Sequence, residues 1–348
     1  MGNPLKQLEI LGRQWLIRLF SLLFRVPNHP LTLSTAPRIL VVRLDERVGN
    51  LVLLTPLLTS LKQTFPNATI DLLANPRGKA LLENHPSLNR IILFEKKKLN
   101  NNGPLAVIRA IRRSKYELAI DAGNPVGPST TQTMVVWLAG ASHTIGAERR
   151  DGARLFSQTV PIPPELKHEI DLRLQLLRVI PNIKLIRTVS IAPRQKCQSR
   201  EDLIKGLPTP FILLNIGARL PEKRLSASEY AQIATTLKAT QKPVLLTYGP
   251  TEEHLAKEVA QRTNVHLAPP TSLEALSELM NEAEAVVSCD TGPMHIAVAV
   301  GTPTFGIFVS TDPERFGYNA TPHRSLDAQS GWKQSFLPEI TDWIHKIT

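Results

Sequence analysis

Short apolar runs and amphipathic stretches alternate along most of this chain, and this alternation constrains its fold more than any other feature. Alternation between strands and helices is typical of a parallel sheet covered by helices on both faces. In the first half, strands are predicted over residues 39–44, 69–74, 90–94 and 118–121, and helices over 50–64, 78–84, 103–114, 130–139 and 165–180.

The second half repeats the pattern. Strands are predicted over 211–216, 244–248, 265–268, 285–289 and 304–308, with helices between them and a last helix over 335–347. Two helices open with a capping-box pattern, Ser226 with Glu229 and Thr271 with Glu274. The sequence therefore predicts an α/β protein with two Rossmann-like domains, whose parallel sheets face each other across a cleft.

The length of 348 residues also favours two domains. We expect a helix and linker over 1–37, an N-terminal domain over 38–180, a C-terminal domain over 181–330, and a final helix over 331–348 that bridges back. A hydrophobic content of 42% and a mean hydropathy of −0.08 are typical of a soluble globular protein. The two cysteines, Cys197 and Cys289, suggest a reduced, cytoplasmic protein without disulfides.

Several site classes lack their signatures. No GxGxxG follows a strand, which disfavours a dinucleotide dehydrogenase, and no GxxxxGK[ST] is present, which excludes a P-loop NTPase. Neither cysteine has a CxxC or Cys/His companion, so no zinc or iron site is expected. The sequence predicts neither a metal nor a cofactor.

The formal net charge is +11, and part of it is local. Residues 96–115 contain seven Lys or Arg residues and no acid. Such a face attracts nucleic acid, anionic lipid or an acidic substrate, or is simply solvated. Aromatic residues make up only 5% of the chain, and none interleaves with the cluster as a stacking platform requires, so we expect no nucleic-acid partner.

The N-terminal segment reads as a basic amphipathic helix. Arg13 and Arg18 interrupt every apolar run long enough to span a bilayer, and no signal-peptide cleavage site follows. A helix of this kind with Trp15 favours contact with the cytosolic membrane surface through residues 5–26, and docking onto the protein itself is the alternative. One face carries the apolar residues Leu8, Leu11, Trp15, Leu19, Leu22 and Val26.

The segment 288–301 carries the most chemical information. An apolar strand runs into Asp290-Thr291-Gly292, and a helix of small residues follows at once. In a parallel sheet this turn lies at the carboxyl edge, where free N–H groups and the helix dipole suit a diphosphate. Gly292 permits close backbone approach, and His295 lies in the first turn. The competing interpretation is an ordinary corner capped by Asp290.

Several stretches resemble the lipopolysaccharide heptosyltransferase family, glycosyltransferase family 9. Residues 39–56 and 61–71 resemble the family's opening, and 168–177 looks like its interdomain helix. Gly217 and Ala218, with residues 222–224, look like its phosphate loop. Residues 290–295, with Ala297, look like its nucleotide-sugar motif, which includes Asp290, Thr291, Gly292, Met294 and His295. These motifs fall in the family's order between about residues 38 and 345.

The resemblance implies a GT-B fold and an inverting, metal-independent transfer from an ADP-sugar to a glycolipid at the cytosolic face. A departing nucleotide diphosphate gains negative charge, which fixed donors stabilise. Lys223 offers a compact charge for it and Arg224 a planar fork, although a solvated loop pair is the alternative. Glu252 or Glu253 lies where such folds bind ribose, but two acids also favour a helix N-terminus.

One position departs from the family pattern. The family's catalytic base is an Asp directly after the glycine of the first loop, and here that residue is Asn50. An amide cannot accept the proton of an acceptor hydroxyl. Asp45 or Glu46 could supply the carboxylate, although Arg43 and Arg47 beside them suggest structural ion pairing.

The sequence therefore predicts a glycosyltransferase, peripheral on the inner face of the plasma membrane, that passes a heptose-like sugar from an ADP-sugar to an acidic lipopolysaccharide-core or other membrane glycolipid. The alternative is a non-catalytic module that binds nucleotide-sugar or glycolipid, because of Asn50.

Overall fold

The structure is a computed structural model that describes Gly12 and residues 26–95, 103–125, 129–148, 153–192, 203–204 and 206–347. Contacts divide the chain into two compact units. The first unit contains the chain up to Glu46 together with Leu54–Thr188. The second contains Arg47–Leu53 and the chain from Val189 onward.

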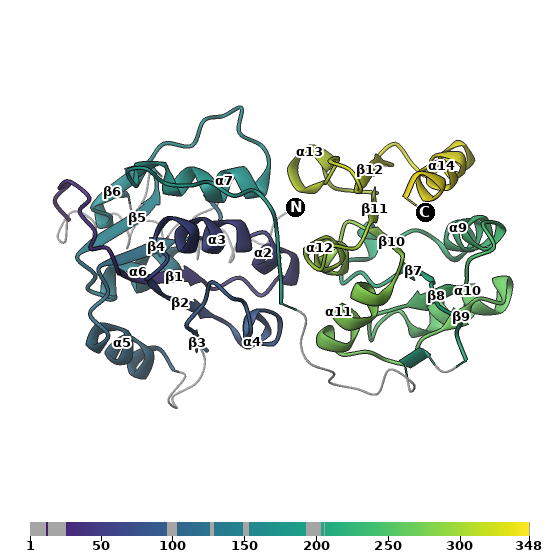
Figure 1. The fold of residues 1–348 in the computed structure, drawn as a ribbon, viewed down its shortest axis with the longest axis horizontal. Helices are drawn as coiled ribbons and strands as arrows, with labels where there is room; N and C mark the ends of the chain where they lie inside the picture. Colours follow the sequence, from purple (N-terminus) through teal and green to yellow (C-terminus); the bar gives the residue numbers. More distant parts are fainter. Residues whose placement is uncertain are drawn as a thin grey trace. The chain divides into compact units, whose positions relative to one another are not determined.

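The first unit is built on a six-stranded parallel sheet in the order β3-β2-β1-β4-β5-β6 (Figure 1). Its strands are β1 (Arg38–Arg43), β2 (Thr69–Ala74), β3 (Arg90–Leu93), β4 (Leu118–Asp121), β5 (His143–Ala147) and β6 (Gln158–Val160). Its helices are α3 (Thr55–Thr64), α4 (Pro76–Leu82), α5 (Pro104–Arg113), α6 (Thr130–Leu138) and α7 (Glu169–Gln175), with 3₁₀ turns η1 (Ala153–Leu155) and η2 (Leu176–Val179).

Both faces of this sheet are covered. Alternate residues of a strand point to opposite faces, and in β1 every residue after the exposed Arg38 is buried. Leu40 and Val42 share one apolar cluster with Val107 and Ile111 of α5. The continuous apolar run of β1 is therefore explained by burial on two sides, as parallel sheets require.

The second unit has a six-stranded parallel sheet in the order β12-β11-β10-β7-β8-β9. Its strands are β7 (Ile212–Asn215), β8 (Val244–Thr247), β9 (His266–Leu267), β10 (Ala285–Cys289), β11 (Thr304–Phe308) and β12 (Arg324–Asp327). Its helices are α2 (Val48–Val52), α9 (Ala227–Ala239), α10 (Glu253–Thr263), α11 (Leu273–Glu282), α12 (Gly292–Ala299), α13 (Pro313–Phe316) and α14 (Leu337–Ile347), with 3₁₀ turns η3 (Pro221–Lys223) and η4 (Gln334–Phe336).

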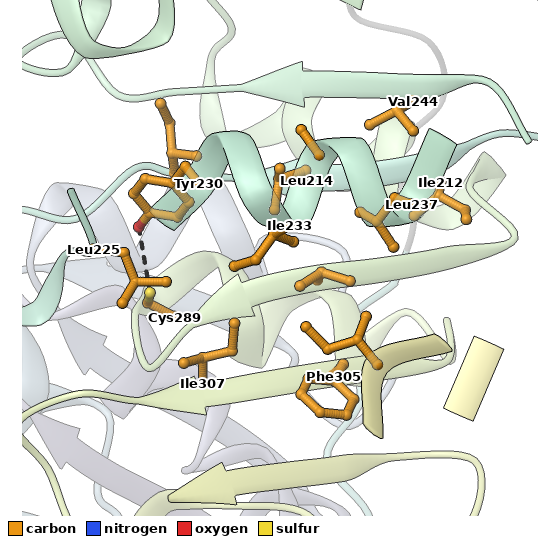
Figure 2. Close-up of a cluster of buried hydrophobic side chains, with 14 of the residues drawn as sticks. Ile212, Leu214, Leu225, Tyr230, Ile233, Leu237, Val244, Cys289, Phe305 and Ile307 are labelled. Carbon is orange, nitrogen blue, oxygen red and sulfur yellow. Dashed lines mark hydrogen bonds between the residues drawn. The ribbon is translucent and has the colours of Figure 1, made fainter. Parts of the chain in front are cut away.

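A large apolar cluster anchors this second sheet (Figure 2). Side chains of α9, including Ile233 and Leu237, pack over residues of β7, β8, β10 and β11. The hydroxyl of Tyr230 lies 3.3 Å from Sγ of Cys289, and both side chains are buried. Burial raises the pKa of Cys289 to about 11, so this thiol stays protonated. Cys289 is therefore a packing residue at the end of β10.

Most predicted strands are confirmed, and β2, β4, β10 and β11 have the predicted bounds. The prediction of one continuous helix over 50–64 is wrong, because the structure has two helices, α2 and α3, separated at Leu53 and Leu54. Pro56 follows this break in the first turn of α3, where its missing N–H costs no hydrogen bond. The predicted helix 165–180 begins later than expected, because α7 covers Glu169–Gln175, and it ends as the 3₁₀ turn η2 over Leu176–Val179.

The capping box at Ser226 and Glu229 is confirmed, whereas that at Thr271 and Glu274 is wrong. The residue that caps α11 is Ser272, whose hydroxyl accepts from the N–H of Ala275 at 3.1 Å. Three strands were not predicted: β5, β6 and β12.

The structure divides the chain after Thr188 rather than at 180, and it groups residues 47–53 with the second unit. The final helix, which we expected to bridge back, places Ile340 and Ile344 in the core of the second unit and packs against α9. The predicted amphipathic helix lies outside the described residues, apart from Gly12 and Val26. In the part of the chain that is described, no helix is long and apolar enough to cross a membrane.

Candidate active site

A buried aspartate organises the carboxyl edge of the second sheet. Asp290 follows β10 directly and is only 3% exposed. Its Oδ2 accepts hydrogen bonds from Nζ of Lys223 at 2.7 Å and from the hydroxyl of Thr311 at 2.5 Å. Lys223 also donates to the backbone oxygen of Asp290 at 3.1 Å. On the other side, Nε2 of His295 lies 3.5 Å from Oδ1 of Asp290.

The charge on Asp290 depends on these partners. Burial alone would raise the pKa of this carboxyl, but the His295 hydrogen bond and the charges of His295 and Lys223 outweigh it and hold the pKa well below 3.8. Asp290 is therefore ionised at every physiological pH. It does not cap the following helix, since the N-cap of α12 is Thr291 and the helix has no side-chain capping hydrogen bond among the described residues. The interpretation of Asp290 as a cap is wrong.

At the start of α12, no capping side chain of the described residues bonds to the backbone N–H groups, so a ligand can accept hydrogen bonds from them. The helix begins at Gly292 with Pro293 next, so the N–H groups of Gly292 and Met294 lie in the first turn, which carries the positive end of the helix dipole. The hydroxyl of Thr291 is buried and has no hydrogen-bond partner among the described residues. Together these donors form a cradle that suits an anionic group.

Helix α2 packs closely against α12 within the second unit, and glycines make this possible. A Cβ on Gly49 would lie 2.6 Å from Cδ2 of His295, and a Cβ on Gly292 would lie 3.1 Å from Cβ of Val48. Real Cβ atoms do not approach a ring carbon as closely as 2.6 Å. The backbone of the first loop therefore lies directly beside the nucleotide-sugar motif, and Asn50, the residue after Gly49, belongs to the same helix.

The predicted phosphate loop follows β7. Ala218 is buried, and a Cβ on Gly217 would lie 3.0 Å from the backbone nitrogen of Gly249 in the loop after β8. Lys223 ends η3, and its side chain remains one quarter exposed while it pairs with Asp290. The structure thus brings Lys223 into contact with Asp290 of the 290–295 motif.

Arg224 pairs with Glu252, whereas the preceding residue, Lys223, pairs with Asp290. Nη2 of Arg224 lies 3.3 Å from Oε1 of Glu252, whose side chain is 2% exposed. Glu252 also accepts from the N–H of Gly249 at 3.1 Å and from the hydroxyl of Thr251. This carboxylate therefore shapes the loop after β8. Glu253 is exposed and pairs with Lys257 one helical turn away.

The carboxyl edge of the first sheet holds the candidate base. Arg43, at the end of β1, is 1% exposed, and its Nη1 donates to the carbonyl oxygen of Ala122 at 2.7 Å. Its Nη2 lies 3.2 Å from Oδ2 of Asp45, which is 21% exposed. Asn75 donates to the backbone oxygen of Asp45. Asp45 is thus held by its partners yet still reaches solvent, whereas Glu46 is exposed.

Two residues of the second-unit network were not predicted. Thr311 lies after β11 and bonds to Asp290, and the hydroxyl of Tyr318 lies 2.9 Å from Nδ1 of His295. The only available signal was the position of Thr311 just past a strand end, at the same edge as Asp290. Among the described residues, no group of three or more His, Cys, Asp or Glu side chains could hold a metal ion.

Solved structures define the class of this fold. A glycosyltransferase family 9 protein from Veillonella parvula superposes with a TM-score of 0.74 at 18% identity, over 90% of this chain and 99% of that one. The Escherichia coli heptosyltransferase WaaC, solved with ADP, superposes with a TM-score of 0.68 at 18% identity, over 89% and 98%. Two parallel six-stranded sheets with this similarity define a GT-B glycosyltransferase fold.

The family follows from sequence. The profile of glycosyltransferase family 9 (heptosyltransferase) matches residues 105–337, about two thirds of the chain. Lipopolysaccharide heptosyltransferase 3 of E. coli is 27% identical over 283 residues, which are 76% of this chain and 81% of that protein. The chain belongs to glycosyltransferase family 9 and is a glycosyltransferase, as the resemblance of its motifs predicted.

The depressed pKa of Asp290 predicts an acid dependence of stability. A group with a lowered folded-state pKa stabilises the fold fully above its ordinary value, 3.8, and loses that contribution as the pH falls toward the folded-state value. At neutral pH, Asp290→Asn should destabilise the second unit by roughly 1–3 kcal/mol, and the difference from wild type should shrink between about pH 5 and pH 2. The stability difference is measured at each pH by urea titration, with hydrogen exchange of peptides from β10 as the readout.

Asp342→Asn is the matched control, because Asp342 is an exposed acid of the same unit. It should leave stability unchanged at each pH. A deficit in Asp290→Asn that stays constant as the solution is acidified would contradict the assignment of an ionised, network-bound carboxylate.

Proposed function

We propose that this chain transfers a heptose-like sugar from an ADP-sugar to a lipopolysaccharide-core or other membrane glycolipid acceptor, with inversion at the anomeric carbon and without a metal. The observation that carries the proposal is the Lys223–Asp290 pair beside the uncapped start of α12. It combines a cation with free backbone donors at the carboxyl edge of a sheet, where nucleotides bind in folds of this type.

The site suits the diphosphate of the donor. As the sugar departs, the bond from its anomeric carbon to the diphosphate oxygen breaks, and the electron pair remains on that oxygen. Lys223 and the N–H groups at the start of α12 would stabilise this charge. Asp290 holds Lys223 by two contacts, so the ammonium group is oriented before the donor binds. A related fold, that of WaaC, was solved with ADP, which supports the choice of nucleotide.

The acceptor hydroxyl must lose its proton as its oxygen bonds to the anomeric carbon. Asn50 cannot take this proton, so we assign the role to Asp45. Asp45 follows β1 at the carboxyl edge and remains partly exposed. The ion pair with Arg43 keeps its carboxylate in one orientation. Asn50 then orients the acceptor hydroxyl by hydrogen bonding.

The donor site predicts two losses of affinity. Lys223→Ala removes a charged donor, and Asp290→Asn removes the group that orients it, so each should weaken ADP binding by roughly 1.5–3 kcal/mol. Titration calorimetry measures the change, with Lys333→Ala, an exposed lysine elsewhere in the second unit, as the control. Wild-type affinity in both Lys223→Ala and Asp290→Asn would mean that the diphosphate binds elsewhere.

The assignment of the base predicts a loss of turnover. Asp45→Asn should reduce the rate of transfer by roughly 10²–10⁴-fold, the usual range for a lost general base, with little change in ADP affinity. Glu46→Gln, at the exposed neighbour, is the matched control. Asn50→Asp restores the family's residue. If only that variant changes the rate, and upward, then Asp45 is not the base and the natural protein is an impaired transferase.

A second candidate function is a non-catalytic module that binds ADP-sugar or glycolipid, and the amide of Asn50 favours it. Purified protein given ADP-heptose and membrane glycolipid acceptors separates the two. Product above background supports the transferase. Tight binding of the ADP-sugar without any product supports the module and refutes the proposed reaction.

We also propose that the protein works as a peripheral protein at the cytoplasmic face of the membrane, in contact with it through residues 5–26. Deletion of residues 1–30 should then shift the protein from anionic vesicles to solution and leave ADP binding intact. Misfolding of the shortened chain would instead indicate a structural role for this segment.

A further inference from the structure

Helix α5 of the first unit has two opposite faces. Its inner face packs Val107 and Ile111 into the apolar cluster under β1 and β4. Its outer face is formed by Leu105, Arg109, Arg112 and Arg113, which follow one another at i, i+4, i+7 and i+8 and so share one side of the helix. All four are exposed. Lys115, just past the helix end, is exposed as well.

Most of the basic side chains on this outer face have no acidic partner among the described residues. In the described ranges, no carboxylate lies within 4.0 Å of the charged groups of Arg109, Arg113 or Lys115. Arg112 is different, because its Nη1 donates to the carbonyl oxygen of Leu138 at the end of α6 at 3.3 Å. The segment 103–115 has no acid. Three cations therefore remain available to a partner.

An apolar residue accompanies these cations. Leu105 is 71% exposed, far more than Leu185 or Leu220, the other exposed large apolar side chains among the described residues. It lies in the first turn of α5 on the same side as Arg109. Cations along one face with an apolar side chain at its end fit an anionic lipid surface, where basic residues meet headgroups and the leucine enters the acyl boundary.

We propose that the outer face of α5, Leu105 with Arg109, Arg113 and Lys115, is a docking surface for an anionic lipid membrane. Nucleic acid is the poorer fit, because no aromatic side chain on this face offers a stacking surface and the exposed leucine would gain nothing from a phosphate backbone. The docking surface belongs to the first unit, whereas the proposed nucleotide site belongs to the second, and the docking surface serves the membrane acceptor of the proposed function. Its test contains neither donor nor acceptor, so the two proposals fail separately.

The test measures sedimentation of the full-length chain with vesicles of phosphatidylcholine, alone or mixed with phosphatidylglycerol. Basic residues at an anionic surface contribute roughly fivefold each to affinity at low salt. The variant Arg109→Gln/Arg113→Gln/Lys115→Gln should therefore bind the anionic vesicles on the order of 100-fold more weakly. The matched control, Lys184→Gln/Lys333→Gln/Lys346→Gln, removes the same charge from exposed lysines elsewhere and should bind like wild type.

Leu105→Ser tests the apolar contact and should weaken binding by roughly tenfold, whereas Leu185→Ser should not. Unchanged circular dichroism and thermal unfolding verify that each variant is folded. Equal binding by the triple variant and wild type, or an equal loss in the lysine control, overturns the proposal. So does Leu105→Ser with wild-type binding, or a preference of the chain for RNA over anionic vesicles that the triple variant abolishes.

Discussion

The ion pair between Lys223 and the buried Asp290 is the interaction on which the rest of the site depends. A carboxylate that is 3% exposed is costly unless its charge is compensated. Lys223 supplies that compensation from the loop after β7, and the same carboxylate is contacted by Thr311 from the loop after β11 and by His295 from α12. Asp290 thus joins the loops that follow β7 and β11 to the start of α12, and the side chain of Lys223 remains one quarter exposed.

Close backbone packing supplies the second constraint. Gly49 lies against the ring of His295, and Gly292 lies against Val48, so α2 and α12 approach more closely than side chains would allow. His295 is therefore fixed between this contact and the hydroxyl of Tyr318. This arrangement explains why a glycine precedes Asn50, because α2, which contains both residues, packs directly against α12 within the second unit.

The sequence predicted the parts of the fold that have strong local signals. Continuous apolar strands such as β10 and β11 were placed at their observed bounds, because burial on both faces leaves an unbroken apolar run. Strand β6 has three residues and β12 lies at the sheet edge with two exposed positions, so neither leaves such a run. Asp290 and Lys223 were predicted from motifs, whereas Tyr318 was not, because only tertiary packing brings it to His295.

A double-mutant cycle tests most directly whether Lys223 and Asp290 act as one unit in donor binding. ADP affinity would be measured by calorimetry for wild type, Lys223→Met, Asp290→Asn and the double variant. Residues in direct contact usually show coupling of about 0.5–3 kcal/mol. We predict that the double variant loses at least about 1 kcal/mol less than the sum of the two single losses. Additive losses would contradict this account, because they would mean that the two residues contribute to ADP binding independently.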